Sequence, residues 1–403
     1  MIVLKFGGTS VGSAQRIRAV AHMVSAIAGR KIVILSAMSG TTDALVQLAQ
    51  RIINAQWQEA EEAVAALEAR YHSVIEELFE TPALRKEVWQ ALAPIFAELQ
   101  SQTHNEAFTQ NDEKRILSRG EIISTTLMAF TLREYENLNA VHLDALSFMR
   151  INHNGEPEPQ HIEKHLTPLL TAAPDPNALF LTEGYICINA FGEIDNLRRG
   201  GSDYTATLVG EAAHAETIEI WTDIDGMHNN DPRLVEGTVA VRHLNFEEAA
   251  ELAYFGAKIL HPTCIQPARY AGVPVRLLNT MAPTAKGTII DNELIPHVIK
   301  SIAAKDDITA VKIVSSRMLL ATGFLRKVFE IFETFNTSID MVTTSEVGVS
   351  LSIDNKMHLT QIVEELKKYG TVVVEENMCI ICVVGDLRWM NVGCESCITA
   401  ALH

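Results

Sequence analysis

The sequence has no apolar run close to the roughly 20 residues that a membrane-spanning helix needs, and only six of its 403 residues are cysteine. The first absence argues against an integral membrane protein, and the second against the disulfide framework of small secreted domains. Positive charge is also scarce, because 33 Lys and Arg stand against 50 Asp and Glu, for a net charge of −17. That balance opposes non-specific binding to nucleic acid or anionic lipid. Any anionic ligand must therefore be bound by a local group of positive charges.

The N-terminus lacks the charged and hydrophobic regions of a secretion signal, because Gly7 and Gly8 follow the short apolar start. The cytoplasm is therefore the expected compartment. The length of 403 residues predicts two or three domains, and the 47% hydrophobic content is typical of a globular protein.

Four of the cysteines lie in the last 25 residues, as the two C-x-x-C pairs Cys379 with Cys382 and Cys394 with Cys397. This spacing alone would allow a zinc ribbon. However, residues 379–385 have the apolar composition of a buried strand, in which residues three apart point to opposite faces. We therefore favour buried core thiols and predict no metal site.

In the first half, short β-rich runs alternate with helical patterns, which predicts a mostly parallel sheet with helices on its faces. A stretch rich in Ala, Glu and Leu at about 56–102 predicts amphipathic helices that cover a face and take no part in the chemistry. The composition changes after Gly287, so we place a catalytic domain at 1–298 and a second region at 299–403. The strand candidates are residues 2–5, 32–35, 179–182 and 217–221.

The second region has the pattern of one β-α-β-β-α-β unit. A further strand at 378–384 and a helix start at Val392 then open a second unit, which the sequence leaves incomplete at His403. The elements expected in the first unit are a strand at 308–314, a helix at 323–335, strands at 338–342 and 347–353, a helix at 359–368 and a strand at 371–374.

A candidate phosphate-binding turn, Lys5-Phe6-Gly7-Gly8-Thr9-Ser10, lies between a β-run and the helical pattern 14–27. Glycines let backbone N–H groups approach an anion, the helix start adds its positive dipole end, and Lys5 adds a compact charge. It is not the P-loop pattern, because the lysine precedes the glycines. Two glycines after a strand are also common in plain tight turns.

A second glycine pair occurs in Arg198-Arg199-Gly200-Gly201-Ser202-Asp203, ahead of the helical run 204–213. Ser202 or Asp203 alone would be read as a helix N-cap. The arginines make an anion site more plausible, because a guanidinium can bind a carboxylate through two parallel hydrogen bonds.

A third cluster begins at Thr222 and Asp223, where a strand meets its C-terminal loop, the place where open α/β sheets bind ligands. It continues to Asp231-Pro232-Arg233, which by itself is an ordinary turn. Further on, Lys258 is expected on a helix, where it either reaches a phosphate or is simply solvated.

Together and in this order, these segments resemble the aspartokinase branch of the amino-acid kinase family, from Ile2 to about Val384. The resemblance implies a three-layer α/β/α sandwich with a mostly parallel central sheet, followed by ferredoxin-like ACT domains of which the second is incomplete. The supporting segments are residues 36–42 (Ser-Ala-Met-Ser-Gly-Thr-Thr), 118–121 (Ser-Arg-Gly-Glu) and 343–346 (Thr-Thr-Ser-Glu).

The resemblance also implies roles for single residues. Lys5 and Asp203 would be catalytic, Arg199 would bind the α-carboxylate of aspartate, and Glu121 its ammonium group. His228 stands where similar enzymes often have tyrosine. The implied aspartate site is Ser36, Thr42, Glu121, Arg199, Gly200, Gly201 and Ser202, and the implied ATP site is Lys5, Phe6, Gly7, Gly8, Thr222, Asp223, His228, Arg233, Lys258 and Ile259.

For the ACT region, the resemblance implies an amino-acid effector, lysine first and threonine second, and a homodimer or higher homo-oligomer. Ala321 departs from the serine that is common at its position. The implied effector residues are Met318, Ala321, Phe324, Leu325, Ser338, Asp340, Ser345 and Glu346.

The implied reaction transfers the γ-phosphate of ATP, with Mg²⁺, to aspartate and gives an acyl phosphate, 4-phospho-L-aspartate. A side-chain carboxylate with a pKa of about 3.9 is already ionised at neutral pH, so the nucleophile needs no base. The difficulty is the repulsion between two anions, which Lys5, backbone amides and Mg²⁺ would reduce. The alternatives are another amino-acid kinase, the kinase half of a fusion with homoserine dehydrogenase, and a non-catalytic amino-acid sensor.

Overall fold

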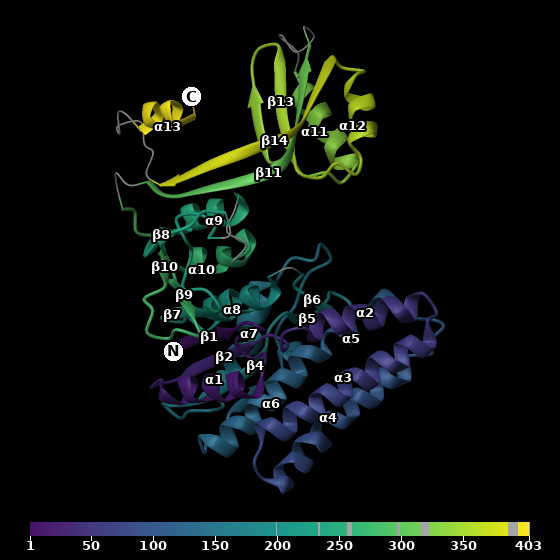
Figure 1. The fold of residues 1–403 in the computed structure, drawn as a ribbon, viewed down its shortest axis with the longest axis vertical. Coiled ribbons are helices and arrows are strands. Elements are labelled where there is room, and N and C mark those ends of the chain that lie inside the picture. Colours follow the sequence, from purple (N-terminus) through teal and green to yellow (C-terminus); the bar gives the residue numbers. More distant parts are fainter. Residues whose placement is uncertain are drawn as a thin grey trace. The chain divides into compact units, whose positions relative to one another are not determined.

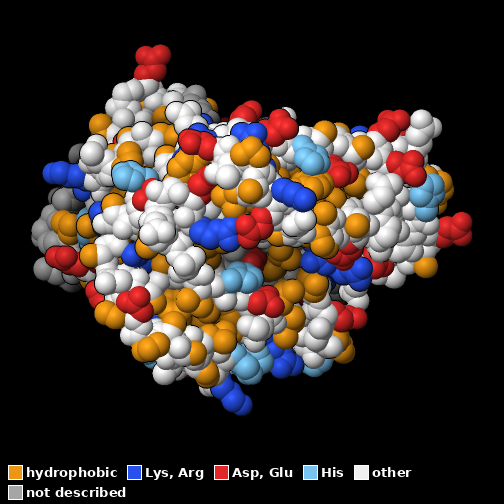
Figure 2. All heavy atoms as spheres, turned by 90° about the horizontal axis from the view of Figure 1, so that it is seen from below, with side chains coloured by type: hydrophobic (Ala, Val, Ile, Leu, Met, Phe, Trp, Pro, Cys, Tyr) orange, Lys and Arg blue, Asp and Glu red, His pale blue; other side chains and the backbone are white. Residues whose placement is uncertain are grey.

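The structure is a computed structural model, and it describes residues 1–198, 200–232, 234–255, 260–295, 299–315, 322–385 and 394–402. The chain divides into two compact units, Met1–Lys300 with Gly385–His403, and Ser301–Val384 (Figure 1). None of the described helices combines the length and apolarity that a membrane crossing requires. On the face drawn in Figure 2, acidic and basic side chains are interspersed among apolar ones.

An eight-stranded sheet forms the centre of the first unit, in the order β3-β4-β2-β1-β7-β9-β10-β8. Every neighbouring pair is parallel except β9 with β10. The C-terminal ends of β1 and its neighbours β2 and β7 therefore lie at the same edge. The strands are β1 (Ile2–Phe6), β2 (Lys31–Leu35), β3 (Val141–Leu143), β4 (Leu179–Glu183), β7 (Thr217–Thr222), β8 (His243–Asn245), β9 (Val275–Asn279) and β10 (Thr288–Asp291).

Helices cover both faces of this sheet. On one face α6 packs on β2 and β4 and contacts α1, and on the other α8 packs on β1, β2 and β7 and contacts α7 and α10. The predicted three-layer sandwich with a mostly parallel sheet is confirmed. The helices are α1 (Ala14–Ala26), α2 (Thr41–Ile53), α5 (Gln110–Leu117), α6 (Arg119–Tyr135), α7 (Pro159–Thr171), α8 (Gly201–Ala212), α9 (Phe246–Phe255) and α10 (Gln266–Ala271), and a two-stranded hairpin is formed by β5 (Ile186–Ile188) and β6 (Ile194–Asn196).

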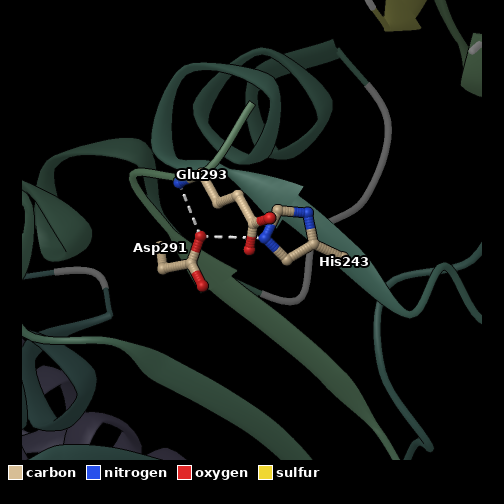
Figure 3. Close-up of side chains that lie close together, drawn as sticks. All are labelled: His243, Asp291 and Glu293. Carbon is tan, nitrogen blue, oxygen red and sulfur yellow. Dashed lines mark hydrogen bonds and ion pairs between the residues drawn. The ribbon is translucent and has the colours of Figure 1, made fainter. Parts of the chain in front are cut away.

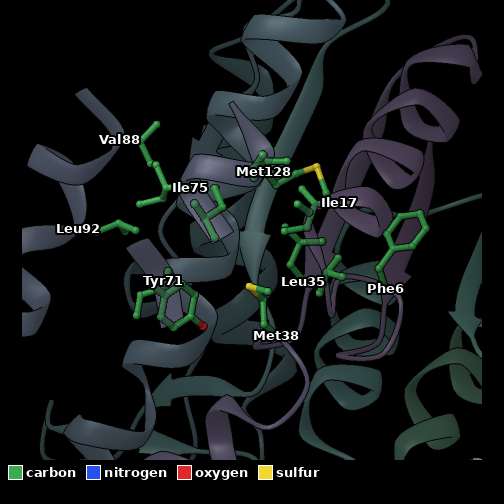
Figure 4. Packing of buried hydrophobic residues seen from close by; sticks show 14 of the residues in the cluster. Phe6, Ile17, Leu35, Met38, Tyr71, Ile75, Val88, Leu92 and Met128 are labelled. Atoms are coloured by element: carbon green, nitrogen blue, oxygen red, sulfur yellow. The ribbon is translucent and has the colours of Figure 1, made fainter. Parts of the chain in front are cut away.

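Two long helices, α3 (Trp57–Leu78) and α4 (Pro82–Gln102), occupy the stretch where amphipathic helices were expected. Their buried residues recur every three or four positions, so each helix has one apolar face. These faces join the core cluster of the sheet, in which Tyr71 and Ile75 of α3 and Leu92 of α4 are buried (Figure 4). Burial of a Leu or Ile side chain contributes about 1.5–3 kcal/mol, so the insertion is firmly attached to the catalytic unit.

The second unit is a four-stranded sheet in the order β12-β13-β11-β14, with β13 antiparallel to both β11 and β12. This order with two helices is the ferredoxin-like arrangement predicted for an ACT domain. Its elements are β11 (Ile299–Val314), α11 (Phe324–Thr334), β12 (Met341–Thr344), β13 (Gly348–Ile353), α12 (Leu359–Leu366) and β14 (Thr371–Gly385).

The separate strand expected at 378–384 is a wrong prediction, because β14 runs without a break through both predicted strands. Asn377, which lies between the two predicted strands, has a left-handed φ of 59° within β14. Asp307 likewise has a left-handed φ of 60° within β11. A single left-handed residue is accommodated in a strand much as in a β-bulge, so each strand continues past it.

The prediction of buried core thiols is wrong for Cys379, which is exposed, while Cys382 is half-buried. The cause is the position of β14 at one end of the described sheet, where part of the strand faces solvent. The side chains of Cys394 and Cys397 lie outside the described residues. They belong to α13 (Cys394–Leu402), which the contacts group with the first unit.

Candidate active site

Three loops converge at the C-terminal edge of the central sheet. Phe6, the last residue of β1, is in register with Leu35 of β2 and with Trp221 of β7. Just after β1, the Gly7 N–H donates to the Trp221 carbonyl at 3.1 Å, and the Ser39 N–H donates to the Gly8 carbonyl at 3.1 Å. The glycine turn is therefore bonded to β7 on one side and to the loop that follows β2 on the other.

A cavity of about 670 Å³ opens at this edge. It brings together most of the residues predicted for aspartate binding and catalysis. The predicted residues that line it are Lys5, Gly8, Ser36, Thr42, Glu121, Gly200, Gly201, Ser202 and Asp203.

Lys5 and Asp203 form an ion pair at the wall of the cavity. Their Nζ and Oδ1 atoms are 2.6 Å apart, and the two side chains are 10% and 12% exposed. Lys5 lies on β1, whereas Asp203 lies in the first turn of α8. Asp203 therefore fixes the position of the Lys5 ammonium group where it faces the cavity.

Each of the two motifs contains a glycine that close packing requires. A Cβ atom on Gly8 would lie 2.7 Å from the Ala37 carbonyl oxygen, and one on Gly201 would lie 2.6 Å from the Tyr185 ring. Gly200 has a left-handed φ of 72°. The amide of Gly7 is already used in its bond to Trp221, which leaves the Gly8 amide as the better placed of the two for a phosphate.

Glu121 is a buried carboxyl group at the same cavity, with only 3% of the residue exposed. Its Oε1 accepts a hydrogen bond from the Ala37 N–H at 3.3 Å, while Oε2 has no hydrogen-bond partner among the described residues. Burial raises the pKa of Glu121 to about 8, and the nearby Glu183 carboxylate adds to the rise. A cation at Oε2 would favour the ionised form.

Of the residues predicted for ATP, Lys5 and Gly8 line the cavity, whereas Thr222 and His228 do not. Thr222 ends β7 next to the glycine turn, and its hydroxyl donates to Asp223 Oδ1 at 3.2 Å. His228 forms hydrogen bonds with Thr238 and Asp225 at 2.9 and 2.7 Å.

Phe6 is fully buried, and its ring stacks on Trp221 at 6.0 Å between centroids. Only its backbone can therefore face a ligand. The nucleotide-binding roles of Phe6, Thr222, Asp223 and His228 stay predictions.

Of the remaining predicted site residues, Arg199, Arg233, Lys258 and Ile259 lie outside the described residues, as do Met318 and Ala321 of the effector set.

The described effector residues lie in the second unit. Phe324 begins α11 and is buried, whereas Leu325 is 37% exposed. The Asp340 carboxylate forms an ion pair with Lys305 at 3.2 Å. Ser338, Ser345 and Glu346 are exposed. Their roles also stay predictions.

Three cavity-lining residues, Asp43, Tyr185 and Asn196, lie outside every motif that the sequence analysis singled out. Asp43 directly follows the segment 36–42, and Tyr185 comes two residues after β4, at the same sheet edge. The position after a parallel strand was a usable signal for Tyr185. Asn196 had no such signal, because it ends the β5-β6 hairpin.

One group of side chains of the metal-ligand type, His243, Asp291 and Glu293, occurs elsewhere in the described part of the first unit (Figure 3). His243 Nε2 lies 2.8 Å from Asp291 Oδ1, which also accepts the Glu293 N–H at 2.7 Å. These hydrogen bonds explain the arrangement without an ion, and Glu293 is exposed. The cluster is not part of the cavity lining.

Comparisons with known proteins agree with the site. A model of the amino acid kinase family matches residues 1–279. The chain is 35% identical over 399 residues to the lysine-sensitive aspartokinase 3 of Escherichia coli, covering 96% of this chain and 87% of the relative.

Two crystal structures of E. coli aspartokinase III are also similar. The complex with aspartate and ADP has a TM-score of 0.82 at 31% identity, covering all (100%) of this chain and 91% of the other. The complex with lysine and aspartate has a TM-score of 0.77 at 33% identity, covering 98% and 90%.

Proposed function

Because this chain belongs to the amino acid kinase family, and within it to the aspartokinases, we propose that it transfers the γ-phosphate of ATP to the β-carboxylate of L-aspartate. The products are 4-phospho-L-aspartate and ADP. The observation that carries this proposal is the cavity itself. A paired ammonium (Lys5) faces the same space as a buried carboxyl (Glu121) whose Oε2 has no hydrogen-bond partner in the described part of the chain.

Glu121 is the group that selects an amino acid. Its Oε2 has no hydrogen-bond partner among the described residues, and the ammonium of aspartate would supply one together with a compensating charge. Arg199 would bind the α-carboxylate, and Ser36, Thr42 and Ser202 supply hydroxyl groups. The backbone of Gly200 and Gly201 lets the substrate approach closely.

In the transfer, a β-carboxylate oxygen of aspartate bonds to the γ-phosphorus while the bond to the β–γ bridging oxygen breaks, and ADP leaves with the electron pair. Lys5 and the Gly8 amide stabilise the negative charge on the transferring phosphoryl oxygens. Asp203 holds Lys5 in place for this task. No proton needs to be removed from the nucleophile.

Mg²⁺ would enter with the nucleotide, and its preference for oxygen ligands fits the carboxylates of Asp203 and Asp43 at the cavity. When bound, it neutralises phosphate charge. For the nucleotide we propose Phe6, Gly7, Thr222, Asp223, His228, Arg233, Lys258 and Ile259, in addition to Lys5 and Gly8.

We further propose a cytoplasmic enzyme that the ACT region assembles into a homodimer or higher homo-oligomer. Lysine is the proposed effector and threonine the second choice, because the E. coli relative is lysine-sensitive and one of its structures holds lysine. The proposed effector site is Met318, Ala321, Phe324, Leu325, Ser338, Asp340, Ser345 and Glu346.

Trapping with hydroxylamine tests the reaction, because hydroxylamine converts an acyl phosphate into a stable hydroxamate. We expect hydroxamate only when ATP, Mg²⁺ and aspartate are all present, and less of it when lysine is added. Absence of hydroxamate under all conditions, or equal formation with glutamate in place of aspartate, would overturn the proposal.

A further inference from the structure

We propose that the helical insertion, α3 and α4, positions the aspartate pocket by holding both of its walls. The sequence predicted that these helices only cover a face. The inference rests on the proposed function, because it concerns how the aspartate-binding side of that site is held in position.

Helix α3 holds the first wall, the loop between β2 and α2. The Tyr71 hydroxyl lies 2.7 Å from Thr41 Oγ1, and both residues are 0% exposed. The adjacent Arg70 donates from Nη2 to the Ser39 carbonyl at 2.6 Å. Two consecutive residues of the insertion therefore bind this loop and the first residue of α2, and the Tyr71 ring packs in the core with Met38 (Figure 4).

This loop depends on such external contacts. Its residues from Ser36 to Gly40 line the cavity, and Gly40 has a left-handed φ of 79°. As the N-cap of α2, Gly40 also provides no side-chain capping bond. The hydroxyl of Thr41, the first residue of α2, is instead fixed from α3.

Helix α4 holds the second wall, the start of α6. Glu98 Oε1 accepts from Arg119 Nη2 at 2.9 Å and from Arg115 Nε at 2.6 Å. Arg119 is the first residue of α6 and stands two positions before Glu121. A single carboxylate of the insertion therefore anchors the turn that presents Glu121 to the cavity.

The two walls touch each other where the substrate ammonium would bind. The Ala37 N–H donates to Glu121 Oε1 at 3.3 Å, and a Cβ atom on Gly120 would lie 2.8 Å from the Ala37 Cβ. A shift of either wall would therefore move the Glu121 carboxylate. Tyr71 and Glu98 do not touch the cavity, so we assign them as positioning residues.

The test compares Tyr71→Phe and Glu98→Gln with two matched controls, Tyr135→Phe on α6 and Glu87→Gln on α4. Tyr135→Phe removes a hydroxyl that donates to the Leu78 carbonyl at 2.7 Å, and Glu87→Gln removes an ion pair with Arg133 at 2.7 Å. Both controls also join α6 to the insertion. Neither Tyr135 nor Glu87 lines the cavity.

We expect Tyr71→Phe and Glu98→Gln each to raise the KM for aspartate about fivefold, because a lost hydrogen bond costs about 1 kcal/mol. The KM for ATP and kcat should stay within twofold of wild type. Arg70→Lys, which keeps the charge and a donor, should raise the KM for aspartate less than Arg70→Ala. The two controls should leave both KM values unchanged.

A purely structural role would be revealed by thermal midpoints that fall while the KM for aspartate stays within twofold of wild type in both test variants, and this would overturn the inference. The inference would also be overturned if the KM for aspartate rose equally in the test variants and in the two controls. If Tyr71→Phe does not fold, the comparison of Glu98→Gln with Glu87→Gln decides. Failure of the proposed function is distinguishable, because the wild-type protein would then form no hydroxamate.

Discussion

Lys5 and Glu121 face the same cavity but are in opposite electrostatic situations. The Lys5 ammonium is compensated by Asp203 at 2.6 Å, whereas Glu121 Oε2 has no hydrogen-bond partner among the described residues. A compensated charge can be held ready for an incoming phosphate at little cost, while an uncompensated buried carboxyl is destabilising until a cation arrives. The cavity is thus prepared for an anion at one end and a cation at the other.

Replacing Lys5 tests the first of these assignments. We expect Lys5→Ala to lower kcat by about 10²–10³-fold, the usual effect of removing one group that stabilises transition-state charge. The protein should stay folded. Steady-state hydroxamate formation measures the change, and circular dichroism checks the fold.

Lys114→Ala is the matched control for Lys5→Ala, because Lys114 also forms an ion pair of 2.6 Å, with Asp195, but does not line the cavity. Its kcat should stay close to that of wild type. Near-normal turnover in Lys5→Ala, or an equal loss in both variants, would refute the assigned role.

Glu121→Gln separates stability from binding. The pKa of the Glu121 carboxyl rises from 4.5 to about 8 on folding, mainly through burial. The unfolded chain therefore loses this proton first, so the stability contributed by the protonated group is fully present below pH 4.5 and is lost as the pH rises to about 8. We expect the variant to be more stable than wild type by about 1 kcal/mol or more above pH 8, and to bind aspartate much more weakly.

Thermal unfolding at pH 6 and pH 9 measures the stability difference, which should grow with pH. Calorimetry in buffers of different ionisation enthalpy should show that aspartate binding at pH 7 releases a proton in the wild type but not in Glu121→Gln. A stability difference that is flat with pH, or binding without proton release in the wild type, would contradict this account.

Lys5, at the end of a predicted strand, was within reach of reasoning from the residues alone, whereas Glu121 was assigned to the site only through the family resemblance. Both line the cavity together with Asp203. Tyr71 was not within reach, because it lies 30 positions after the Thr41 hydroxyl that it contacts. Neither local propensity nor strand spacing encodes which helix packs beside which loop. Such contacts appear only once the tertiary fold is known.

At the scale of elements, long buried strands were the easiest to predict, although β9, with three of its five residues buried, was missed. The strands β1, β2, β4 and β7 are almost entirely buried, read as apolar runs, and begin and end within one residue of their predicted limits. The strands β3, β8 and β10 have three or four residues each and were not predicted. Their pairing depends on neighbouring strands, which a local pattern does not reveal.

The glycine turn after β1 can be tested as an element. A Cβ atom on Gly8 would lie 2.7 Å from the Ala37 carbonyl, whereas one on Gly7 would meet nothing closer than 3.6 Å. We expect Gly8→Ala to lower the free energy of unfolding by about 1–3 kcal/mol, because a backbone atom cannot yield as a flexible side chain would. Gly7→Ala should change it by much less. Denaturant unfolding measures both, and equal losses would show that the close approach of the two loops is not what requires glycine.

At the scale of the whole molecule, the described residues include a hydrophobic cluster in each of the two units. The first lies on one face of the central sheet, and the second lies between the ACT sheet and its helices α11 and α12. The family and fold class predicted from motif order are confirmed. A catalytic core and a regulatory core of this kind predict that each ligand stabilises its own unit.

Hydrogen exchange measured by mass spectrometry can resolve this division. We expect aspartate to slow amide exchange at 36–42 and 118–121, and lysine to slow it at 338–346. A ligand present at 100 times its dissociation constant stabilises the folded unit that binds it by about 2.7 kcal/mol, so amide exchange that requires unfolding of that unit should slow by up to about 100-fold.

Asp340→Asn should abolish the effect of lysine. Asp354→Asn is the control, because Asp354 binds the same Lys305 at 2.9 Å but is not in the proposed effector site. Protection by threonine and not by lysine would overturn the choice of effector, and a lysine effect that survives Asp340→Asn would remove Asp340 from its site.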